Sequence, residues 1–223
     1  MLDIYKATTE EHSICFQPHE RQLQRLKNQG FEPKVIYDIG ACVLHWTHTA
    51  KKVFPDSKYI LFDAWEPAEQ LYKDYDYHIG VLSNKSRDVT FYQNDDIPYG
   101  NSYYREIATQ DLVFPKSSGR TKHAKPLDEI VKTRNFPAPD IIKVDVQGAE
   151  RDILEGGIET LKKAKYLIVE MQHTNYNDGA PHFEETGQWL ESLGWKCIAW
   201  RFASGSIFNV DADYLYINES QQR

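Results

Sequence analysis

The sequence predicts a single α/β domain built on a mostly parallel β-sheet. Two segments, 35–41 and 140–150, begin as runs rich in β-branched residues, reach an acidic residue and a glycine, and lead into helix-like stretches. Strands that are covered by helices on both faces are apolar throughout and meet ligands at their carboxyl ends. Along most of the chain such runs alternate with helical patterns, which is typical of βαβ units. We therefore expect a Rossmann-like three-layer sandwich with a seven-stranded, mostly parallel sheet and an antiparallel edge strand.

The expected elements follow the chain in order. A helix over 19–29, ended by Gly30, belongs to an N-terminal helical extension of residues 1–33. Helices are also expected over 44–53, 67–75, 126–132, 150–163 and 183–193, and the seven strands begin at Val35, Lys58, Tyr77, Asp140, Tyr166, Trp195 and Asp213. A short extra strand over 89–93 is expected to pair with the third strand. The last two strands are joined by a short turn region at 203–206, so they should form an antiparallel pair at one edge of the sheet.

Composition limits the classes of function. The chain has 223 residues, a hydrophobic content of 41% and a formal net charge of −7. These values suit one domain over 1–223 with a full core, and the lack of a basic stripe argues against nucleic acid as a partner. No apolar run has the roughly 20 residues of a membrane span, and the start lacks the pattern of a signal peptide. The three cysteines are widely spaced and form no paired motif, so we expect a cytoplasmic protein with no membrane partner.

Residues 94–125 interrupt the alternation of strands and helices. The stretch contains proline and glycine residues and has no clear hydrophobic period. Long irregular segments inside compact domains are usually lids or binding loops, so we expect a substrate or lid loop insertion. Its side chains suit stacking on, and hydrogen bonding to, a polar ring such as a sugar. The expected substrate-binding residues are Tyr99, Asn101, Ser102, Tyr103 and Arg105. The alternative is a surface loop whose tyrosines only pack against the sheet.

The ends of the first two strands suggest a nucleotide-type site. Asp38 and Gly40 stand where the first strand turns into its helix, and a glycine there lets backbone N–H groups approach a ligand. Asp63 ends the second strand and suits the two hydroxyl groups of an adenosine ribose. We expect Trp46 and Trp65 to flank the cofactor crevice, with Trp65 against the adenine, and core packing is the alternative for Trp46. The alternative is that both aspartates only cap the following helix and turn. A nicotinamide-dependent oxidoreductase is disfavoured, because the first turn has no complete GxGxxG motif.

Three motifs stand at strand ends: DIGACVL over 38–44, FD over 62–63 and KVDVQGAE over 143–150. Shorter matching segments lie at 82–84, 101–102, 126–130, 153–156 and 168–170. Together they resemble the FkbM family of S-adenosylmethionine-dependent methyltransferases, and the resemblance extends over about 35–173. It implies a class I methyltransferase that methylates a hydroxyl group of a sugar or another small polar acceptor.

The resemblance also implies roles for individual residues. The candidate catalytic residues are Asp145, Glu170 and His173, at the ends of the fourth and fifth strands. For His173 a structural role at the strand end is an equal alternative. The cofactor-binding residues are expected to be Asp38, Gly40, Ala41, Cys42, Asp63, Ala64, Leu82, Ser83 and Asp145. The expected partner is a small-molecule or glycan acceptor, and a homodimer is compatible with the sequence.

Departures from the family pattern leave a second hypothesis open. Cys42 replaces an asparagine, Gln147 a glutamate and Leu44 the second glycine of the cofactor loop. A leucine there restricts how closely the backbone can approach the methionine part of the cofactor. The alternative is therefore a non-catalytic, methyltransferase-like module that binds a glycan or protein through the tyrosine-rich loop. No metal is expected, because His45 and His48 lack a third ligand.

Overall fold

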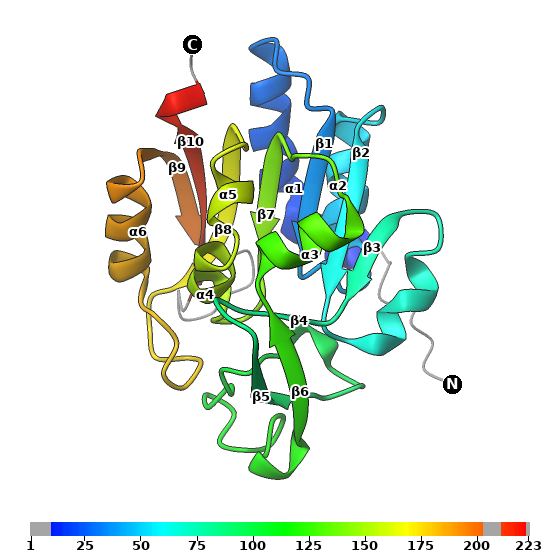
Figure 1. Cartoon of the computed structure of the whole chain (residues 1–223), viewed down its shortest axis with the longest axis vertical. Coiled ribbons are helices and arrows are strands. Elements are labelled where there is room, and N and C mark those ends of the chain that lie inside the picture. The colour runs from blue at the N-terminus through cyan, green and yellow to red at the C-terminus, as the bar shows by residue number, and fades with distance from the viewer. Residues whose placement is uncertain (1–9, 203–210, 222–223) are drawn as a thin grey trace.

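The main sheet has seven strands in the order β3-β2-β1-β7-β8-β10-β9 (Figure 1). The computed structural model describes residues 10–202 and 211–221, so the expected turn at 203–206 lies outside the described residues. The strands are β1 (Val35–Ile39), β2 (Lys58–Asp63), β3 (Asp76–Ile79), β7 (Ile141–Val144), β8 (Tyr166–Gln172), β9 (Trp195–Phe202) and β10 (Asp211–Asn218). Strand β10 is antiparallel to both of its neighbours, β8 and β9, whereas the other pairs are parallel. The predicted fold class and the antiparallel pair at one edge are confirmed.

Helices cover both faces of this sheet (Figure 1). On one face lie α1 (Glu10–Asn28) and α2 (His45–Val53), and on the other lie α3 (Leu127–Arg134), α4 (Glu150–Glu155), α5 (Ile158–Leu161) and α6 (Phe183–Ser192). The helix predicted over 150–163 is interrupted at Gly156 and Gly157. A side chain at Gly156 would lie 2.1 Å from the carbonyl oxygen of Ser83, so the close approach of that segment requires glycine. The helix predicted over 67–75 is a short 3-10 helix, η2 (Glu66–Leu71).

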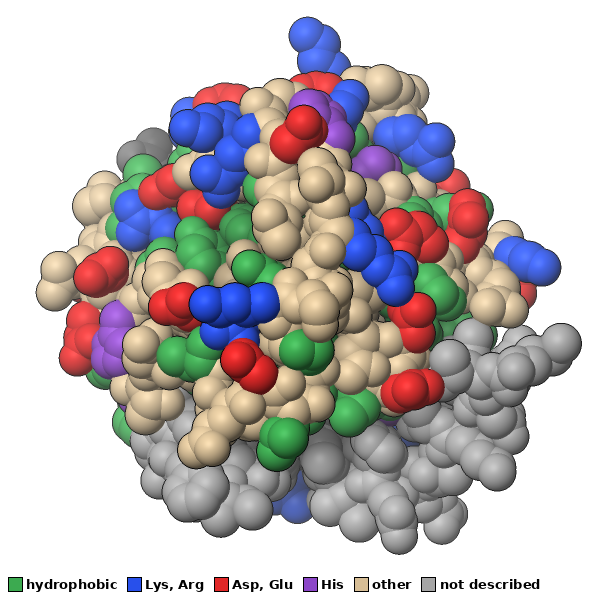
Figure 2. All heavy atoms as spheres, turned by 90° about the horizontal axis from the view of Figure 1, so that it is seen from below, with side chains coloured by type: hydrophobic (Ala, Val, Ile, Leu, Met, Phe, Trp, Pro, Cys, Tyr) green, Lys and Arg blue, Asp and Glu red, His purple; other side chains and the backbone are tan. Residues whose placement is uncertain are grey.

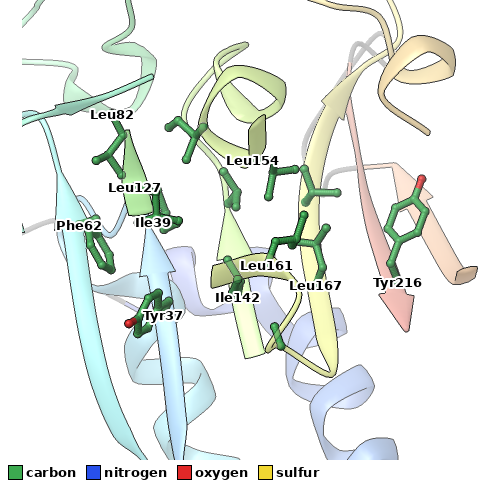
Figure 3. Packing of buried hydrophobic residues seen from close by; sticks show 14 of the residues in the cluster. Tyr37, Ile39, Phe62, Leu82, Leu127, Ile142, Leu154, Leu161, Leu167 and Tyr216 are labelled. Carbon is green, nitrogen blue, oxygen red and sulfur yellow. The ribbon is translucent and has the colours of Figure 1, made fainter. Parts of the chain in front are cut away.

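Alternate strand residues pack into two cores, one on each side of the sheet. Tyr37, Ile142 and Leu167 come from neighbouring strands and point to the side of α3–α6 (Figure 3). Ile36 and Ile168 point to the opposite side, where they pack with α1 and α2. Burial on both faces explains why these strands are apolar throughout.

A second, three-stranded sheet was not predicted. It contains β4 (Val81–Leu82), β5 (Arg87–Tyr92) and β6 (Gly119–Lys125), in the order β4-β6-β5, beyond the lower end of the main sheet (Figure 1). The prediction that the extra strand pairs with the third strand is wrong, because β5 pairs antiparallel with β6. The segment 94–125 is irregular only as far as β6, apart from the short 3-10 helices η3 (Pro98–Gly100) and η4 (Lys116–Ser118). Strand β6 is mostly polar and buries only Ala124, so it carries little hydrophobic signal.

The surface carries charges of both signs. Figure 2 shows lysine and arginine side chains interspersed with aspartate and glutamate over the described part of the lower face. Among the helices of residues 10–202 and 211–221, none is long and apolar enough to cross a bilayer.

Candidate active site

A pocket opens at the carboxyl ends of β1, β2, β7 and β8 and reaches the loop 98–103. Its empty volume, including the open mouth, is about 1070 Å³. The expected site residues that line it are Gly40, Ala41, Cys42, Asp63, Ala64, Leu82, Tyr99, Asn101, Ser102, Tyr103, Asp145 and Glu170. Residues far apart in the sequence therefore meet where ligands bind in open α/β sheets.

The turn after β1 is held by backbone contacts. Gly40 has φ +83°, and a side chain there would lie 1.8 Å from the carbonyl oxygen of Asp145. The N–H groups of Gly40 and Ala41 both donate to the carbonyl oxygen of Phe62, at 2.9 and 3.2 Å. These two N–H groups are therefore used within the fold. Gly40 is required for the close packing of the turn against the end of β7.

Leu44 takes the left-handed conformation that a glycine would adopt easily. Its φ is 70°, which costs a residue with a side chain roughly 1–2 kcal/mol. The side chain is buried in the core beneath α1 and α2, and it does not line the pocket. The departure from the family pattern therefore leaves the pocket open, because the turn keeps its conformation and directs the leucine inward.

Asp63 ties two turns together at the end of β2. Its Oδ2 accepts a 2.7 Å hydrogen bond from the backbone nitrogen of Cys42, and its Oδ1 accepts one of 2.8 Å from that of Trp65. Burial raises the pKa of Asp63, which these two bonds partly offset. An ionised carboxylate has about four acceptor positions, so both oxygens can still accept from hydroxyl groups of a ligand in the pocket.

A buried lysine that lines the inner wall of the pocket lies between two aspartates. Lys143 Nζ is 3.2 Å from Asp145 Oδ2 and 3.5 Å from Asp38 Oδ1, and its side chain is only 4% exposed. Asp38 also accepts a 2.5 Å hydrogen bond from the Thr47 hydroxyl. Burial opposes the charge on Lys143, but the two carboxylates outweigh it and raise its pKa. Lys143 is therefore a fixed positive charge.

Asp145 and Glu170 form a carboxylate pair at the pocket floor. The side-chain amide of Gln147 donates to both, at 3.1 Å to Asp145 and 2.9 Å to Glu170. Burial raises the pKa of Asp145, but the charge of Lys143 and the hydrogen bonds that Asp145 accepts outweigh it and keep this pKa below its ordinary value. Burial and the neighbouring Asp145 charge raise the pKa of Glu170 well above its ordinary value. Within the pair, Glu170 therefore holds a proton more readily than Asp145 does.

Glu150 stabilises the turn that carries this pair. Its Oε1 accepts from the backbone nitrogens of Val146 and Gly148, at 2.9 and 3.2 Å, at the start of α4. The turn contains Gln147 at φ 60° and Gly148 at φ 99°. Glu150 does not line the pocket, and it serves as the acceptor for N–H groups of the turn that precedes α4.

The loop wall of the pocket is fastened to α4 by one buried carboxylate, Asp152. It accepts hydrogen bonds from Tyr103, Tyr104, Arg87 and Asn84, at 3.0, 3.2, 3.1 and 3.3 Å. These donors come from β5, the segment before it and the loop after it. The contact fixes the wall against the main sheet.

Tyr99 and Asn101 face the pocket from this loop. The ring of Tyr99 stacks on that of His45, with centroids 6.0 Å apart and an angle of 12°. Asn101 Oδ1 accepts from the backbone of Asn94 at 2.7 Å, whereas its Nδ2 is buried and has no hydrogen-bond partner among the described residues. The site therefore has an unsatisfied donor close to its ligand space.

Four of the expected site residues do not line the pocket: Asp38, Ser83, Arg105 and His173. Asp38 lies beneath it, and Ser83 is fully buried and accepts from Arg87. Arg105 pairs with Asp111. His173 bonds to the Tyr214 hydroxyl at 2.8 Å and stacks on Phe183 at 4.0 Å, where burial lowers its pKa. The position of His173 favours a structural role over a catalytic one. Asp38, Ser83 and Arg105 lie behind the residues that line the pocket.

Only one of the two tryptophans expected beside the cofactor crevice lines the pocket. Trp46 lines the pocket, whereas Trp65 is buried away from it and donates to Asp95 at 2.9 Å. His45 lines the pocket but His48 is exposed, so the two histidines do not share a site. The signal for Trp46 and His45 was the start of α2 directly after the turn, where side chains face the carboxyl ends of the strands.

The sheet order and the position of the pocket define the class I methyltransferase fold. Two solved structures have a similar fold over most of the chain. The O-methyltransferase TomG from Streptomyces achromogenes, in complex with SAM, has a TM-score of 0.51 and 11% identity, and the match covers 97% of this chain and 95% of TomG. The magnesium protoporphyrin IX methyltransferase ChlM from Synechocystis, with bound SAM, has a TM-score of 0.51 and 9% identity, and the match covers 98% of this chain and 85% of ChlM. At such low identity these likenesses concern the fold alone.

Residues 38–197, well over half of the chain, match the family described as the methyltransferase FkbM domain. The chain belongs to this family of S-adenosylmethionine-dependent methyltransferases. Among curated proteins, a hexuronic acid methyltransferase, AglP, from Haloferax volcanii is 30% identical over 91 residues. That match covers 40% of this chain and 34% of AglP, so it spans about a third of the relative.

The residues of the pocket fit S-adenosylmethionine. Asp63 keeps acceptor capacity for ribose hydroxyls, and Trp46 supplies an apolar wall. The Asp145 carboxylate, whose pKa lies below its ordinary value, suits a positively charged sulfur. Leu44 takes no space in the pocket, and the Nδ2 donor of Asn101 lacks a partner among the described side chains.

Proposed function

We propose that this protein transfers a methyl group from S-adenosylmethionine to a hydroxyl oxygen of a sugar or another small polar acceptor. The observation that carries the proposal is the pair of Asp145 and Glu170 at the pocket floor, bridged by Gln147. A carboxylate within reach of a hydroxyl group can accept its proton while the oxygen attacks, which typically contributes about 10²- to 10⁴-fold.

Each group of the pair has a separate task in this proposal. When bound, S-adenosylmethionine supplies an electrophilic methyl group on a sulfonium centre that leaves as a neutral thioether. Asp145, whose side chain is 26% exposed, accepts the hydroxyl proton of the acceptor. Glu170 holds the side-chain amide of Gln147, and Gln147 and Lys143 hold the Asp145 carboxylate in place. Alignment of donor and acceptor accounts for much of the remaining rate gain.

The charges of the pocket favour a neutral acceptor. Lys143 is the only lysine or arginine among the described residues that line the pocket, and two carboxylates already pair with it. An acidic sugar, such as the hexuronic acid named for AglP, would lie near Asp145 without a free cationic partner. The ring of Tyr99 lines the pocket, and an aromatic wall suits a neutral sugar ring.

The second candidate function is a non-catalytic binding module. It depended on Leu44 obstructing the cofactor, and that side chain is directed into the core. The intact carboxylate pair therefore favours the enzyme.

Two measurements test the proposal. Calorimetric titration with S-adenosylhomocysteine should give saturable binding in the micromolar range. Tritium-labelled S-adenosylmethionine should then label neutral methyl glycosides in preference to the matching uronates, and labelling should be lost in D145N while S-adenosylhomocysteine still binds. Failure of the wild-type protein to bind S-adenosylhomocysteine at millimolar concentration would contradict the proposal and favour the binding module.

A further inference from the structure

A chain of buried polar contacts links α1 to the pocket, although α1 lies outside the segment that matches the family. His19 Nδ1 is 3.1 Å from the indole nitrogen of Trp46, and His19 Nε2 is 2.9 Å from Asp213 Oδ2. His19, Trp46 and Asp213 are 4%, 2% and 7% exposed. Buried polar groups that are paired in this way hold the elements that carry them in one arrangement.

The partners fix the hydrogen positions of His19. An indole N–H can only donate, so Nδ1 of His19 accepts and its proton resides on Nε2. Nε2 then donates to the carboxylate of Asp213. The imidazole thus uses both of its nitrogens, one toward α2 and one toward β10.

Both ends of this contact lie beside the proposed active site. Trp46 lines the pocket directly. Asp213 is the register partner of Glu170 across β10 and β8. Two residues further along these strands, Leu215 and Ile168 are also partners and pack in the core beneath α1 and α2, so Asp213 and Glu170 lie on that same face of the sheet.

We infer that His19 is a positioning residue of the active site, which holds Trp46 as a wall of the cofactor pocket and Asp213 beside Glu170. This role rests on the proposed function and adds α1 to the elements that build the site. It makes the N-terminal helix a contributor to cofactor affinity as well as a cover of the sheet.

The test is a mutant cycle measured by calorimetric titration with S-adenosylhomocysteine. His19→Phe keeps a ring but removes both hydrogen bonds of the imidazole. It should weaken binding about fivefold, because Trp46 loses the hydrogen bond that holds it in the pocket wall. His19→Gln, which keeps an acceptor and a donor, should recover most of the affinity. In a W46F background, His19→Phe should change the affinity less than twofold, because the contact with the indole is already lost. Leu26→Ala, a buried apolar change in the same helix, should lower the melting temperature and leave the affinity unchanged.

A second readout follows the contact itself. The indole N–H signal of Trp46 in NMR spectra, assigned by its absence in W46F, should shift in His19→Phe and stay in place in Leu26→Ala. The role of His19 would be overturned if a folded His19→Phe protein kept the wild-type affinity, or if His19→Phe and W46F had independent effects. Either result would leave the proposed function standing. Absence of binding by the wild-type protein would overturn the proposed function, and this role with it.

Discussion

The backbone nitrogen of Cys42 donates a 2.7 Å hydrogen bond to Oδ2 of Asp63, which joins the turn after β1 to the end of β2. The same carboxylate lines the pocket. One side chain therefore sets the shape of the cofactor turn and faces the space where the ribose is expected.

Asp63→Ala should weaken binding of S-adenosylhomocysteine at least about tenfold, because it removes a charged acceptor and leaves two backbone N–H groups unpaired. Asp63→Asn keeps one acceptor oxygen and should lie between the alanine variant and wild type. Calorimetry gives the affinities, and Asp56→Ala, at an exposed site before β2, is the control. Equal affinities for Asp63→Ala and wild type would remove Asp63 from the cofactor site.

Leu44→Gly restores the glycine of the family pattern. Relief of the left-handed φ gains roughly 1–2 kcal/mol, whereas loss of a buried leucine costs roughly 2–5 kcal/mol, so the net loss of stability is about 2 kcal/mol. Leu44→Ala keeps the strained backbone and should be less stable still. Urea unfolding measures both, and the affinity for S-adenosylhomocysteine should stay within about threefold of wild type. A tenfold gain in affinity would show that Leu44 obstructs the cofactor.

Glu150→Gln should make the protein less sensitive to rising pH. Burial raises the pKa of Glu150 from 4.5 to about 7. Between these values the folded protein keeps a proton that the unfolded chain releases, so wild-type stability falls as pH rises through this window. A pKa change of one corresponds to about 1.4 kcal/mol, so the variant should gain up to about 3 kcal/mol over wild type by pH 8, with little difference at pH 4.

Urea unfolding at a series of pH values checks the prediction for Glu150. The exposed Glu159→Gln, whose side chain is 70% accessible, is the control and should show no such trend. A constant difference between Glu150→Gln and wild type across the series would show that the pKa of Glu150 is the same in the folded and the unfolded protein.

Asp152→Ala should loosen the loop wall of the pocket. It leaves Arg87, Tyr103 and Tyr104 without their shared acceptor, and loss of a buried, charged hydrogen-bond partner costs roughly 2–4 kcal/mol. Hydrogen exchange should speed up in 101–105 and in β5, ahead of the main sheet. Asp88→Ala, an exposed change on β5, is the control. Unchanged exchange in 101–105 would mean that other contacts hold the wall.

Local motifs carried most of the prediction of the site. Gly40, Asp63 and Asp145 each stand at a strand end, and parallel strands bring such ends to one edge of the sheet. Alternate residues of the main strands are buried on the two opposite faces of the sheet, so these strands could be predicted from their apolar runs.

The features that the sequence could not predict depend on contacts between residues far apart in the chain. Strand β6 is polar and belongs to a small sheet with a core of three buried residues, so its hydrophobic signal is weak. His173 was expected to be a candidate base, but in the structure it stacks on Phe183 and forms a hydrogen bond with the Tyr214 hydroxyl. His19 and Asp213 are 194 positions apart, and no local pattern connects them.

A crystal structure with S-adenosylhomocysteine tests the central claim most directly, namely that this pocket holds the cofactor above the pair of Asp145 and Glu170. We expect the ribose hydroxyls within hydrogen-bond distance of Asp63, the sulfur facing Asp145, and Leu44 still in the core. A cofactor bound elsewhere, or displaced from Asp145 so that no acceptor hydroxyl could reach both it and the sulfur, would contradict the account.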